Sequence, residues 1–407
     1  MKVLIVTFEF VPFSGGIARY TYEIARGMAA LDCQVTVLAP TYNHCKEIDA
    51  QSNFKTIRMP VRHDGKAEFL RFLPGLKSLN RQIVTSRPDV VLLTSDLAHG
   101  LGAVVCVRNQ VPFAAVIHGS EIVKHFPPKS LRKYFQYPSL KFCYTRAGVV
   151  FCVSRYVRNL MLEAGFDGSK LFVVHNGIDE KLLSIPYNTE AVTALRQKHG
   201  LKNKKVILTI ARLTARKGQD QMIRSMPALL TKDPNVCYIL IGTGEDKNDL
   251  EKLVQEVGIK DAVIFTGEIA EAEKIHYLDL CDAFVLLSRN DGQRVEGLGI
   301  SLLEATARAK PLIASSHGGI KEIVKDGVNG FFVDPRNYSQ VADRIARILQ
   351  DANLAKHLGE SAKETVAENF TTSQMAQKTT QRLAALLISK DRKHHHLSSR
   401  YKERIED

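Results

Sequence analysis

Two cations and two carboxylates in the second half of the chain have the residue types and the spacing of a candidate binding site. Arg212 and Lys217 follow an apolar run, Val206–Ile210, at the point where the pattern becomes helical. Glu296 and Glu304 lie farther along, eight residues apart, on either side of a Gly-Leu-Gly bend. Fixed cations stabilise a departing diphosphate, and carboxylates accept hydrogen bonds from sugar and ribose hydroxyls. The pattern therefore predicts a site in which cations bind a diphosphate and carboxylates bind hydroxyl groups.

The residues between the two glutamates support this interpretation. Gly297, Leu298 and Gly299 lead into an apolar helical pattern, so backbone N–H groups and the positive end of a helix can face phosphate oxygens. Eight residues are a little over two helical turns, which lets Glu296 at the helix entry and Glu304 inside it share a face. Because the sequence contains no D-x-D triplet, we expect side-chain cations rather than a bound metal to stabilise the diphosphate.

Two loops near the N-terminus are further candidates. Gly15 and Gly16 precede a helical pattern and can let the backbone approach a ligand, although an ordinary turn remains possible and G-x-G-x-x-G is absent. His118 directly follows the apolar run Phe113–Ile117, where it can contact a transferred sugar near the reacting centre or simply bond to its own loop. Glu121 can either orient His118 or cap the next helix, and the sequence does not separate these roles.

Short apolar runs alternate with amphipathic helical patterns along the whole chain. Runs of this length between helices predict right-handed βαβ units and doubly wound parallel sheets, with ligands beyond the carboxyl ends of the strands. The series restarts after a polar stretch around residues 184–204, which predicts two Rossmann-like domains facing a cleft, residues 1–185 and 186–371. The predicted strands are Val3–Thr7, Val35–Ala39, Val90–Leu93, Phe113–Ile117, Val149–Val153, Phe172–Val174, Val206–Ile210, Tyr238–Ile241, Val263–Phe265, Phe284–Leu287, Leu312–Ala314 and Phe331–Val333.

Composition narrows the class of protein. The 407 residues exceed the size of a single core, and no run of about 18 apolar residues predicts a membrane-spanning helix. Seven cysteines without a C-x-x-C pair are typical of reduced, buried thiols in a cytoplasmic protein. Glu9 interrupts the apolar stretch at the start of the chain, which favours a buried first strand over a signal peptide.

The net charge of +13 is concentrated in the first half of the chain. Residues 1–188 carry 23 Lys and Arg against 14 Asp and Glu, whereas the remainder carries 33 against 29. Such a surface suits an anionic membrane or an acidic acceptor, or has no partner. Because no nucleic-acid-binding signature accompanies the charge, we do not expect nucleic acid as a partner.

Together these motifs resemble family 4 glycosyltransferases of the GT-B fold, which are retaining and metal-independent. The resemblance covers nearly the whole chain and extends to Ser316-His317-Gly318-Gly319 with Glu322, and to Asp326-Gly-Val-Asn-Gly-Phe331. It implies that Glu296 contacts the donor sugar, Glu304 the ribose, Arg212 and Lys217 the diphosphate, and His118 the donor sugar near the reacting centre. It also implies that a terminal helix, residues 372–390, returns to the N-terminal domain ahead of a charged tail, residues 391–407.

The residues around Glu296 narrow the resemblance to one group of glycosyltransferases. V-E-G-L-G-I, preceded by S-R-N-D-G, is similar to mannosyltransferases that act on phosphatidylinositol lipids. We therefore expect a hexose from GDP-mannose or UDP-glucose to be transferred to an acceptor hydroxyl, without a cofactor. The acceptor is expected to be lipid-linked or a polysaccharide precursor. The alternatives are a GT-B sugar-nucleotide epimerase and a non-catalytic sugar-nucleotide-binding subunit.

The segment Lys124–Phe135 is a candidate membrane contact. It interleaves cations with aromatic residues, so it can lie on an anionic membrane as a peripheral protein does, or form an ordinary amphipathic helix. His394, His395 and His396 in the tail can bind metal, but a frayed polar terminus accounts for them as well.

Overall fold

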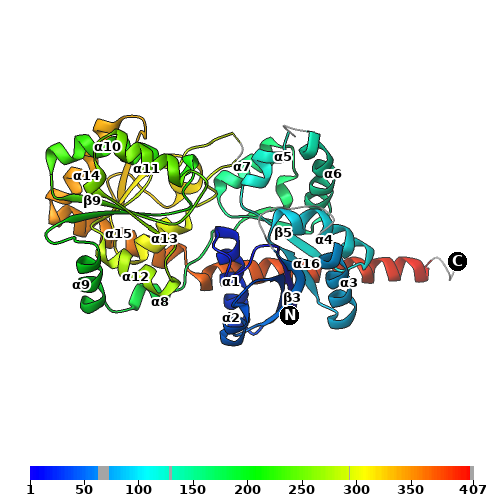
Figure 1. The fold of residues 1–407 in the computed structure, drawn as a ribbon. Coiled ribbons are helices and arrows are strands. Elements are labelled where there is room, and N and C mark those ends of the chain that lie inside the picture. The colour runs from blue at the N-terminus through cyan, green and yellow to red at the C-terminus, as the bar shows by residue number, and fades with distance from the viewer. Residues whose placement is uncertain (63–72, 128–130, 293, 404–407) are drawn as a thin grey trace. The chain divides into compact units, whose positions relative to one another are not determined.

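The structure divides the chain into two units, shown in Figure 1. It is a computed structural model that describes residues 1–62, 73–127, 131–292 and 294–403. Unit 1 comprises Met1–Gly177 and the chain from Thr372 onward, and unit 2 comprises Ile178–Thr371. The chain therefore first leaves unit 1 at Gly177, whereas the sequence analysis placed the first domain's end at residue 185.

Unit 1 contains a seven-stranded sheet in the order β3-β2-β1-β4-β5-β6-β7, with every neighbouring pair parallel. Its central strands are buried on both sides, as expected when helices cover both faces of a parallel sheet. The strands are β1 (Lys2–Val6), β2 (Gln34–Thr41), β3 (Lys55–Arg62), β4 (Val90–Leu93), β5 (Phe113–Ile117), β6 (Val149–Cys152) and β7 (Leu171–Val173).

The helices of unit 1 connect these strands, and the last helix of the chain joins them. They are α1 (Gly16–Ala29), α2 (Cys45–Gln51), α3 (Leu73–Ser86), α4 (Asp96–Arg108), α5 (Ser120–His125), α6 (Leu131–Arg146), α7 (Arg155–Glu163) and α16 (Thr372–Glu403).

Unit 2 repeats the design with six parallel strands in the order β10-β9-β8-β11-β12-β13. In both sheets the strand order reverses direction at the first strand, which is the switch point where open α/β sheets bind ligands. The strands are β8 (Lys205–Ile210), β9 (Val236–Ile241), β10 (Val263–Gly267), β11 (Ala283–Leu286), β12 (Leu312–Ser315) and β13 (Gly330–Val333).

Helices cover both faces of the unit 2 sheet, and an apolar core lies against each face. In Figure 1, α10, α11 and α14 lie on one face and α12, α13 and α15 on the other. The helices are α8 (Lys181–Ser184), α9 (Thr189–Lys198), α10 (Gln219–Lys232), α11 (Lys247–Glu256), α12 (Glu271–Leu280), α13 (Ile300–Ala307), α14 (Tyr338–Gln350) and α15 (Ala352–Asn369).

The two Rossmann-like sheets predicted from the sequence are confirmed, and each of the twelve predicted strands is present. The sequence analysis missed β3. In the described part of the chain this strand pairs with β2 alone, at the edge of the sheet. It contains Pro60 and is largely half-buried or exposed. An edge strand needs no continuous apolar run, so it lacked the pattern used to find the others.

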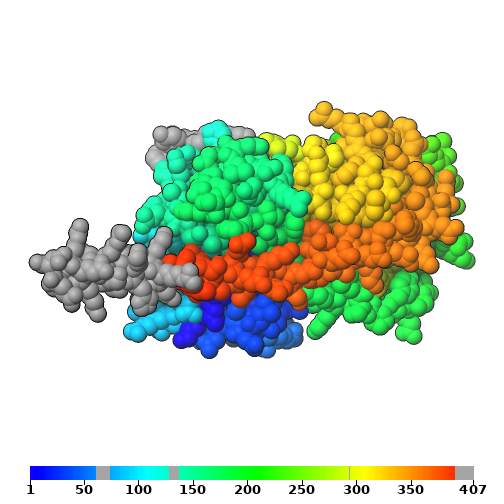
Figure 2. Space-filling view, turned by 180° about the vertical axis from the view of Figure 1, so that it is seen from behind, coloured from blue at the N-terminus to red at the C-terminus, as the bar shows by residue number. Residues whose placement is uncertain are grey.

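Helix α16 packs on unit 1, along whose surface its first part lies in Figure 2. Thr372 at its start donates a hydrogen bond of 2.9 Å from Oγ1 to the buried carboxylate of Glu23, and Gly27 on α1 leaves room for Ala376. The helix continues past residue 390, where the sequence analysis ended it, to Glu403. No Gly or Pro in this stretch would stop it.

Among the described residues no helix is both long enough and apolar enough to cross a bilayer. The candidate membrane segment Lys124–Phe135 includes residues 128–130, which lie outside the described residues.

Candidate active site

Lys217 lies in a tight turn between β8 and α10. The 3-10 turn Ala215–Lys217 ends at Gly218, whose φ of 75° starts α10 in the left-handed region. A Cβ on Gly218 would lie 2.1 Å from the carbonyl oxygen of Leu287, so only glycine fits against the loop after β11. The turn therefore brings the two cations Arg216 and Lys217 next to the carboxyl end of β11.

Glu296 receives three hydrogen bonds on a single oxygen. Lys217 Nζ lies 2.6 Å, Arg216 Nη1 3.2 Å and Ser288 Oγ 3.1 Å from Glu296 Oε2. The carboxylate is only 10% exposed, with Lys217 and Arg216 at 14% and 15%. Among the described residues no donor reaches Oε1 of Glu296, so this oxygen can accept from a ligand.

The charges at this cluster control its protonation. Burial by itself raises the pKa of Glu296, but the charges of Lys217 and Arg216 outweigh burial and lower the pKa to about 2. Burial lowers the pKa of Lys217, and Glu296 opposes that shift. Glu296 is therefore a carboxylate at neutral pH and can only accept hydrogen bonds from a ligand.

A pair of glycines holds the backbone of Glu296 in place. Gly319 N–H donates to Glu296 O at 3.0 Å. A Cβ on Gly318 would lie 2.2 Å from Glu296 O, and one on Gly319 would lie 2.0 Å from Gly297 O. The sequence analysis noted Gly318 and Gly319 only as part of the family resemblance. The structure explains why both are glycine: the backbone of residues 296–297 packs too closely against them for a side chain.

Gly299 precedes the helix that carries the second glutamate. It has φ 98° and is the N-cap of α13, which begins four residues after Glu296. Gly297 and Leu298 lie in the loop between Glu296 and this cap, next to the positive end of the helix. Residues 297–299 thus occupy the position that the sequence analysis expected for backbone contacts with a ligand.

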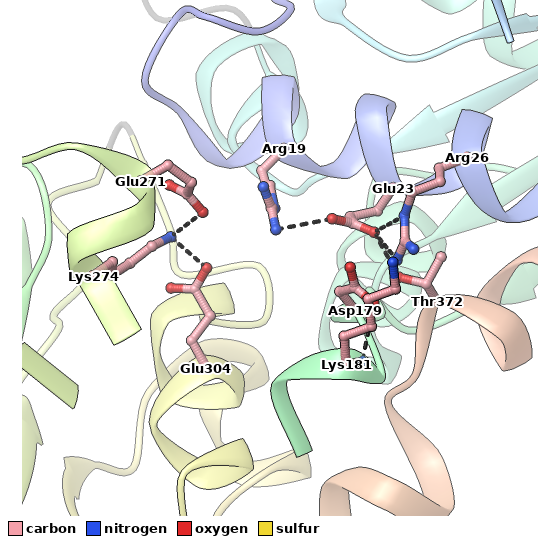
Figure 3. Close-up of polar contacts among 9 residues, drawn as sticks. All are labelled: Arg19, Glu23, Arg26, Asp179, Lys181, Glu271, Lys274, Glu304 and Thr372. Atoms are coloured by element: carbon pink, nitrogen blue, oxygen red, sulfur yellow. Dashed lines mark hydrogen bonds and ion pairs between the residues drawn. The ribbon is translucent and has the colours of Figure 1, made fainter. Parts of the chain in front are cut away.

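Glu304 lies inside α13, with a side chain that is 6% exposed. Figure 3 shows its carboxylate beside Lys274 of α12, whose Nζ is 2.7 Å from Glu304 Oε1 and 2.9 Å from Glu271 Oε1. The sequence analysis did not select Lys274. The sequence feature that could have identified Lys274 is its place in the first turn of α12, the helix that follows β10. That strand ends at the same edge of the sheet.

Arg212 and Arg216 occupy different environments. Arg212 is exposed and forms no ion pair with a described residue, but its charge is close enough to lower the pKa of Lys217. Its carbonyl oxygen accepts a bond of 3.0 Å from Gln219 Nε2. Arg216, which the sequence analysis did not select, contacts Glu296 directly, so the structure brings together Lys217, Arg216 and Glu296 rather than Lys217 and Arg212 alone.

His118 lies in unit 1 at the carboxyl end of β5. Its Nε2 is 3.1 Å from the carbonyl oxygen of Thr94, which can only accept, so Nε2 carries the proton. Its ring meets Tyr20 edge to face at 5.0 Å, and burial lowers its pKa to about 4. His118 is therefore neutral at physiological pH, with Nδ1 as a hydrogen-bond acceptor.

Glu121 supports the His118 loop. Its Oε1 accepts the backbone N–H of His118 at 3.2 Å, while Oε2 is buried and has no hydrogen-bond partner among the described residues. Burial raises the pKa of this carboxyl group. The contact holds the backbone of His118 at the start of α5, so it fits both roles that the sequence left open for Glu121.

Gly15 and Gly16 mark the start of α1. Gly15 is its N-cap with extended backbone, and Gly15 O accepts from Arg19 N–H at 3.0 Å. A side chain at Gly15 would approach Phe13 to 3.2 Å, a tight contact. The pair thus lies at the positive end of a helix after β1.

The candidate site in unit 2 combines groups of both charges. It places cations beside a carboxylate and a helix N-terminus, with a second carboxylate farther along that helix. Within the described parts of the chain, no three His, Cys, Asp or Glu side chains gather as a set of metal ligands. Two parallel Rossmann-like sheets with this site define a GT-B glycosyltransferase.

Comparison with known proteins gives the family. Residues 14–182 match the family model described as Glycosyltransferase Family 4, and residues 192–365 match the model described as Glycosyl transferases group 1. The chain belongs to the glycosyltransferases that these two models describe.

One similar relative is the GDP-mannose-dependent alpha-(1-6)-phosphatidylinositol monomannoside mannosyltransferase of Mycolicibacterium smegmatis. The two are 28% identical over 90% of this chain and 94% of that protein. Among solved structures, Anabaena HepE in complex with UDP and glucose has a TM-score of 0.79 at 21% identity, covering 95% of this chain and all of that one. Sucrose-phosphate synthase from Thermosynechococcus elongatus has a TM-score of 0.78 at 20% identity, covering 95% and 99%. These structures support the GT-B fold.

Proposed function

We propose that this glycosyltransferase moves a hexose from a nucleotide diphosphate sugar to an acceptor hydroxyl, with retention of configuration and without a metal. The observation that carries the proposal is the cluster in which Lys217 and Arg216 contact Glu296 beside the start of α13. In it, cations for a leaving diphosphate lie next to a carboxylate for the hydroxyls of the transferred sugar.

The residues selected from the sequence have the following proposed roles. Lys217 and Arg212 bind the diphosphate, and the backbone N–H groups of residues 297–299 assist them. Glu296 accepts hydrogen bonds from the donor sugar through its open oxygen, and Glu304 accepts from the ribose. In unit 1, the neutral His118 accepts a hydrogen bond from the donor sugar through Nδ1, and Gly15 and Gly16 allow close approach of the backbone.

The proposed reaction takes place on one face of the sugar. The bond from the anomeric carbon to the leaving phosphate oxygen breaks while the acceptor oxygen forms the new bond to that carbon on the same face. The acceptor's proton passes to the leaving phosphate oxygen, so the products are the glycoside and the nucleoside diphosphate. Lys217 and Arg212 offset the negative charge that develops on the diphosphate, which is the task that a cation performs in metal-dependent transferases.

GDP-mannose is our first choice of donor, and a phosphatidylinositol-type lipid our first choice of acceptor. The relative from Mycolicibacterium smegmatis, whose name includes both, covers 90% of this chain. The basic first half of the chain suits an anionic membrane surface, with the enzyme bound peripherally on the cytoplasmic side. Flotation with liposomes that contain anionic lipid tests this contact, and absence of binding at low salt rejects it.

Family membership favours transfer over the two other activities considered. An epimerase needs no second substrate, and a binding subunit needs no turnover, whereas the matched families are transferases. Release of nucleoside diphosphate that depends on an added acceptor distinguishes transfer from both.

Thermal unfolding with a panel of nucleoside diphosphates and their sugars, in the presence of EDTA, tests the donor assignment. Ligands that bind only the folded protein raise its Tm, by an amount that follows their affinity. We expect GDP and GDP-mannose to give the largest shifts. A preference for UDP would reject mannose but keep the donor site, and no shift with any nucleotide would reject the donor site itself.

A further inference from the structure

Lys274 connects two carboxylates at the far end of the candidate site. Its Nζ is 2.7 Å from Glu304 Oε1 and 2.9 Å from Glu271 Oε1, as Figure 3 shows. The three side chains differ greatly in exposure: Glu304 is 6% exposed, Lys274 17% and Glu271 63%. Lys274 therefore forms a nearly buried pair with Glu304 and a solvent-exposed pair with Glu271.

Glu304 depends on this lysine to balance its charge. Among the described residues, Lys274 is the sole donor to the Glu304 carboxylate, and the bond uses Oε1. Glu304 is inside α13, where backbone N–H groups bond within the helix and cannot serve a side chain. Without Lys274 the carboxylate would be a nearly buried, unpaired charge, which a protein avoids by moving or neutralising it.

The geometry leaves the other oxygen of Glu304 for a ligand. Lys274 holds Oε1, and no described residue donates to Oε2. A carboxylate that is already fixed in one orientation loses less freedom when a ligand binds, and so binds more tightly.

We propose that Lys274 is a positioning residue for ribose recognition: by holding Glu304 Oε1 it keeps Oε2 oriented toward the ribose hydroxyls of the donor. This inference rests on the proposed function, in which Glu304 accepts from the ribose. Glu271 has a minor part, since its pair with Lys274 is exposed and such pairs contribute little.

A purely structural role for Lys274, holding α12 against α13, predicts a different result. Loss of packing would weaken every nucleotide similarly, whereas loss of Glu304 orientation would weaken only nucleotides that have ribose hydroxyls. The diagnostic quantity is therefore the ratio of the Kd of a 2′,3′-dideoxynucleotide to that of the ordinary ribonucleotide.

Isothermal titration calorimetry with GDP, UDP and their 2′,3′-dideoxy forms measures this ratio. A hydrogen bond to a charged group changes a Kd by about 10- to 100-fold, so the wild-type protein should favour the ribonucleotide by at least about 10-fold. Lys274→Met should reduce the ratio to about 3 or less, and Lys274→Arg should restore most of it. Lys252→Met is the control, because Lys252 on α11 is 71% exposed. Thermal unfolding verifies that each variant is folded.

Glu304→Gln tests the contact between Glu304 and the ribose separately from the positioning role of Lys274. If this variant loses the ratio but Lys274→Met keeps it, Lys274 does not position Glu304 and the inference is overturned. If Glu304→Gln also keeps the ratio, the ribose contact itself is wrong. If wild-type protein binds neither nucleotide, the donor site is wrong, and the inference falls with it.

Discussion

Lys217 Nζ lies 2.6 Å from Glu296 Oε2, so the residue proposed for the diphosphate pairs directly with the residue proposed for the sugar. In the free protein each satisfies the charge of the other inside a site that is largely shielded from water. A donor must therefore exchange this contact: its diphosphate takes a share of Lys217 while its sugar hydroxyls approach the open oxygen of Glu296. The pair keeps both groups charged and in place until then.

Glu296→Gln should separate sugar recognition from nucleotide recognition. The amide cannot provide the charged acceptor that a sugar hydroxyl needs, so turnover of the sugar nucleotide should fall about 10- to 100-fold. Affinity for the bare nucleoside diphosphate should stay within about 3-fold or improve, since Lys217 and Arg216 lose a competing anion. Steady-state rates and calorimetry measure the two quantities. Equal losses in both would contradict the assignment of Glu296 to the sugar.

Lys217→Ala should abolish most turnover in a folded protein. Removing one fixed donor that faces a developing negative charge costs about 10²- to 10³-fold in kcat. Arg216 and Ser288 remain to satisfy Glu296, so the fold should persist, as circular dichroism can verify. Lys247→Ala is the matched control, because Lys247 is 45% exposed in a surface pair and should keep near-normal activity. Near-normal turnover of Lys217→Ala itself would reject its proposed role.

Gly218→Ala should destabilise the protein far more than Gly258→Ala does. Both glycines have positive φ, 75° and 71°, so each substitution carries a backbone cost of about 1 kcal/mol. A Cβ at Gly218 would also lie 2.1 Å from Leu287 O, whereas nothing lies within 4 Å of one at Gly258. Urea denaturation should therefore show at least about 2 kcal/mol between the two variants. Similar stabilities would mean that the turn before α10 tolerates a side chain.

His118 should make stability depend on pH in a defined window. Burial lowers the pKa of His118 from 6.5 to about 4. Between pH 6.5 and 4, His118 therefore binds a proton in the unfolded chain but not in the folded protein. The unfolding free energy should therefore fall as the pH falls from 6.5 toward 4, by about 2–3 kcal/mol from this residue. His118→Asn, which does not titrate, should lack that part of the slope in denaturation curves. An unchanged slope in the variant would show that His118 is not held neutral.

Because His118 stays neutral, its protonation should not make the activity depend on pH. If Nδ1 accepts from the donor sugar, kcat/KM should show no loss attributable to His118 between about pH 5 and 8. A drop in the wild type near pH 6.5 that is missing in His118→Asn would indicate an exposed, ordinary imidazole instead.

Much of this protein could be predicted from its sequence because buried parallel strands are continuous apolar runs. All strands that are covered on both faces gave this pattern, and parallel strands direct the residues that follow them to one edge of a sheet. Lys217 and Glu296 each follow such a strand, β8 and β11, which is why the sequence alone could assign two residues 79 positions apart to one site.

The tertiary structure decided which side chains meet. Arg212 and Arg216 are both cations near β8, but the turn before Gly218 brings Arg216 to Glu296 and leaves Arg212 exposed. No spacing rule could pair Lys274 with Glu304, because the contact depends on how α12 packs beside α13. Periodicity reports which face of an element is buried, whereas partners across elements follow from the packing of whole helices and strands, which only the folded chain specifies.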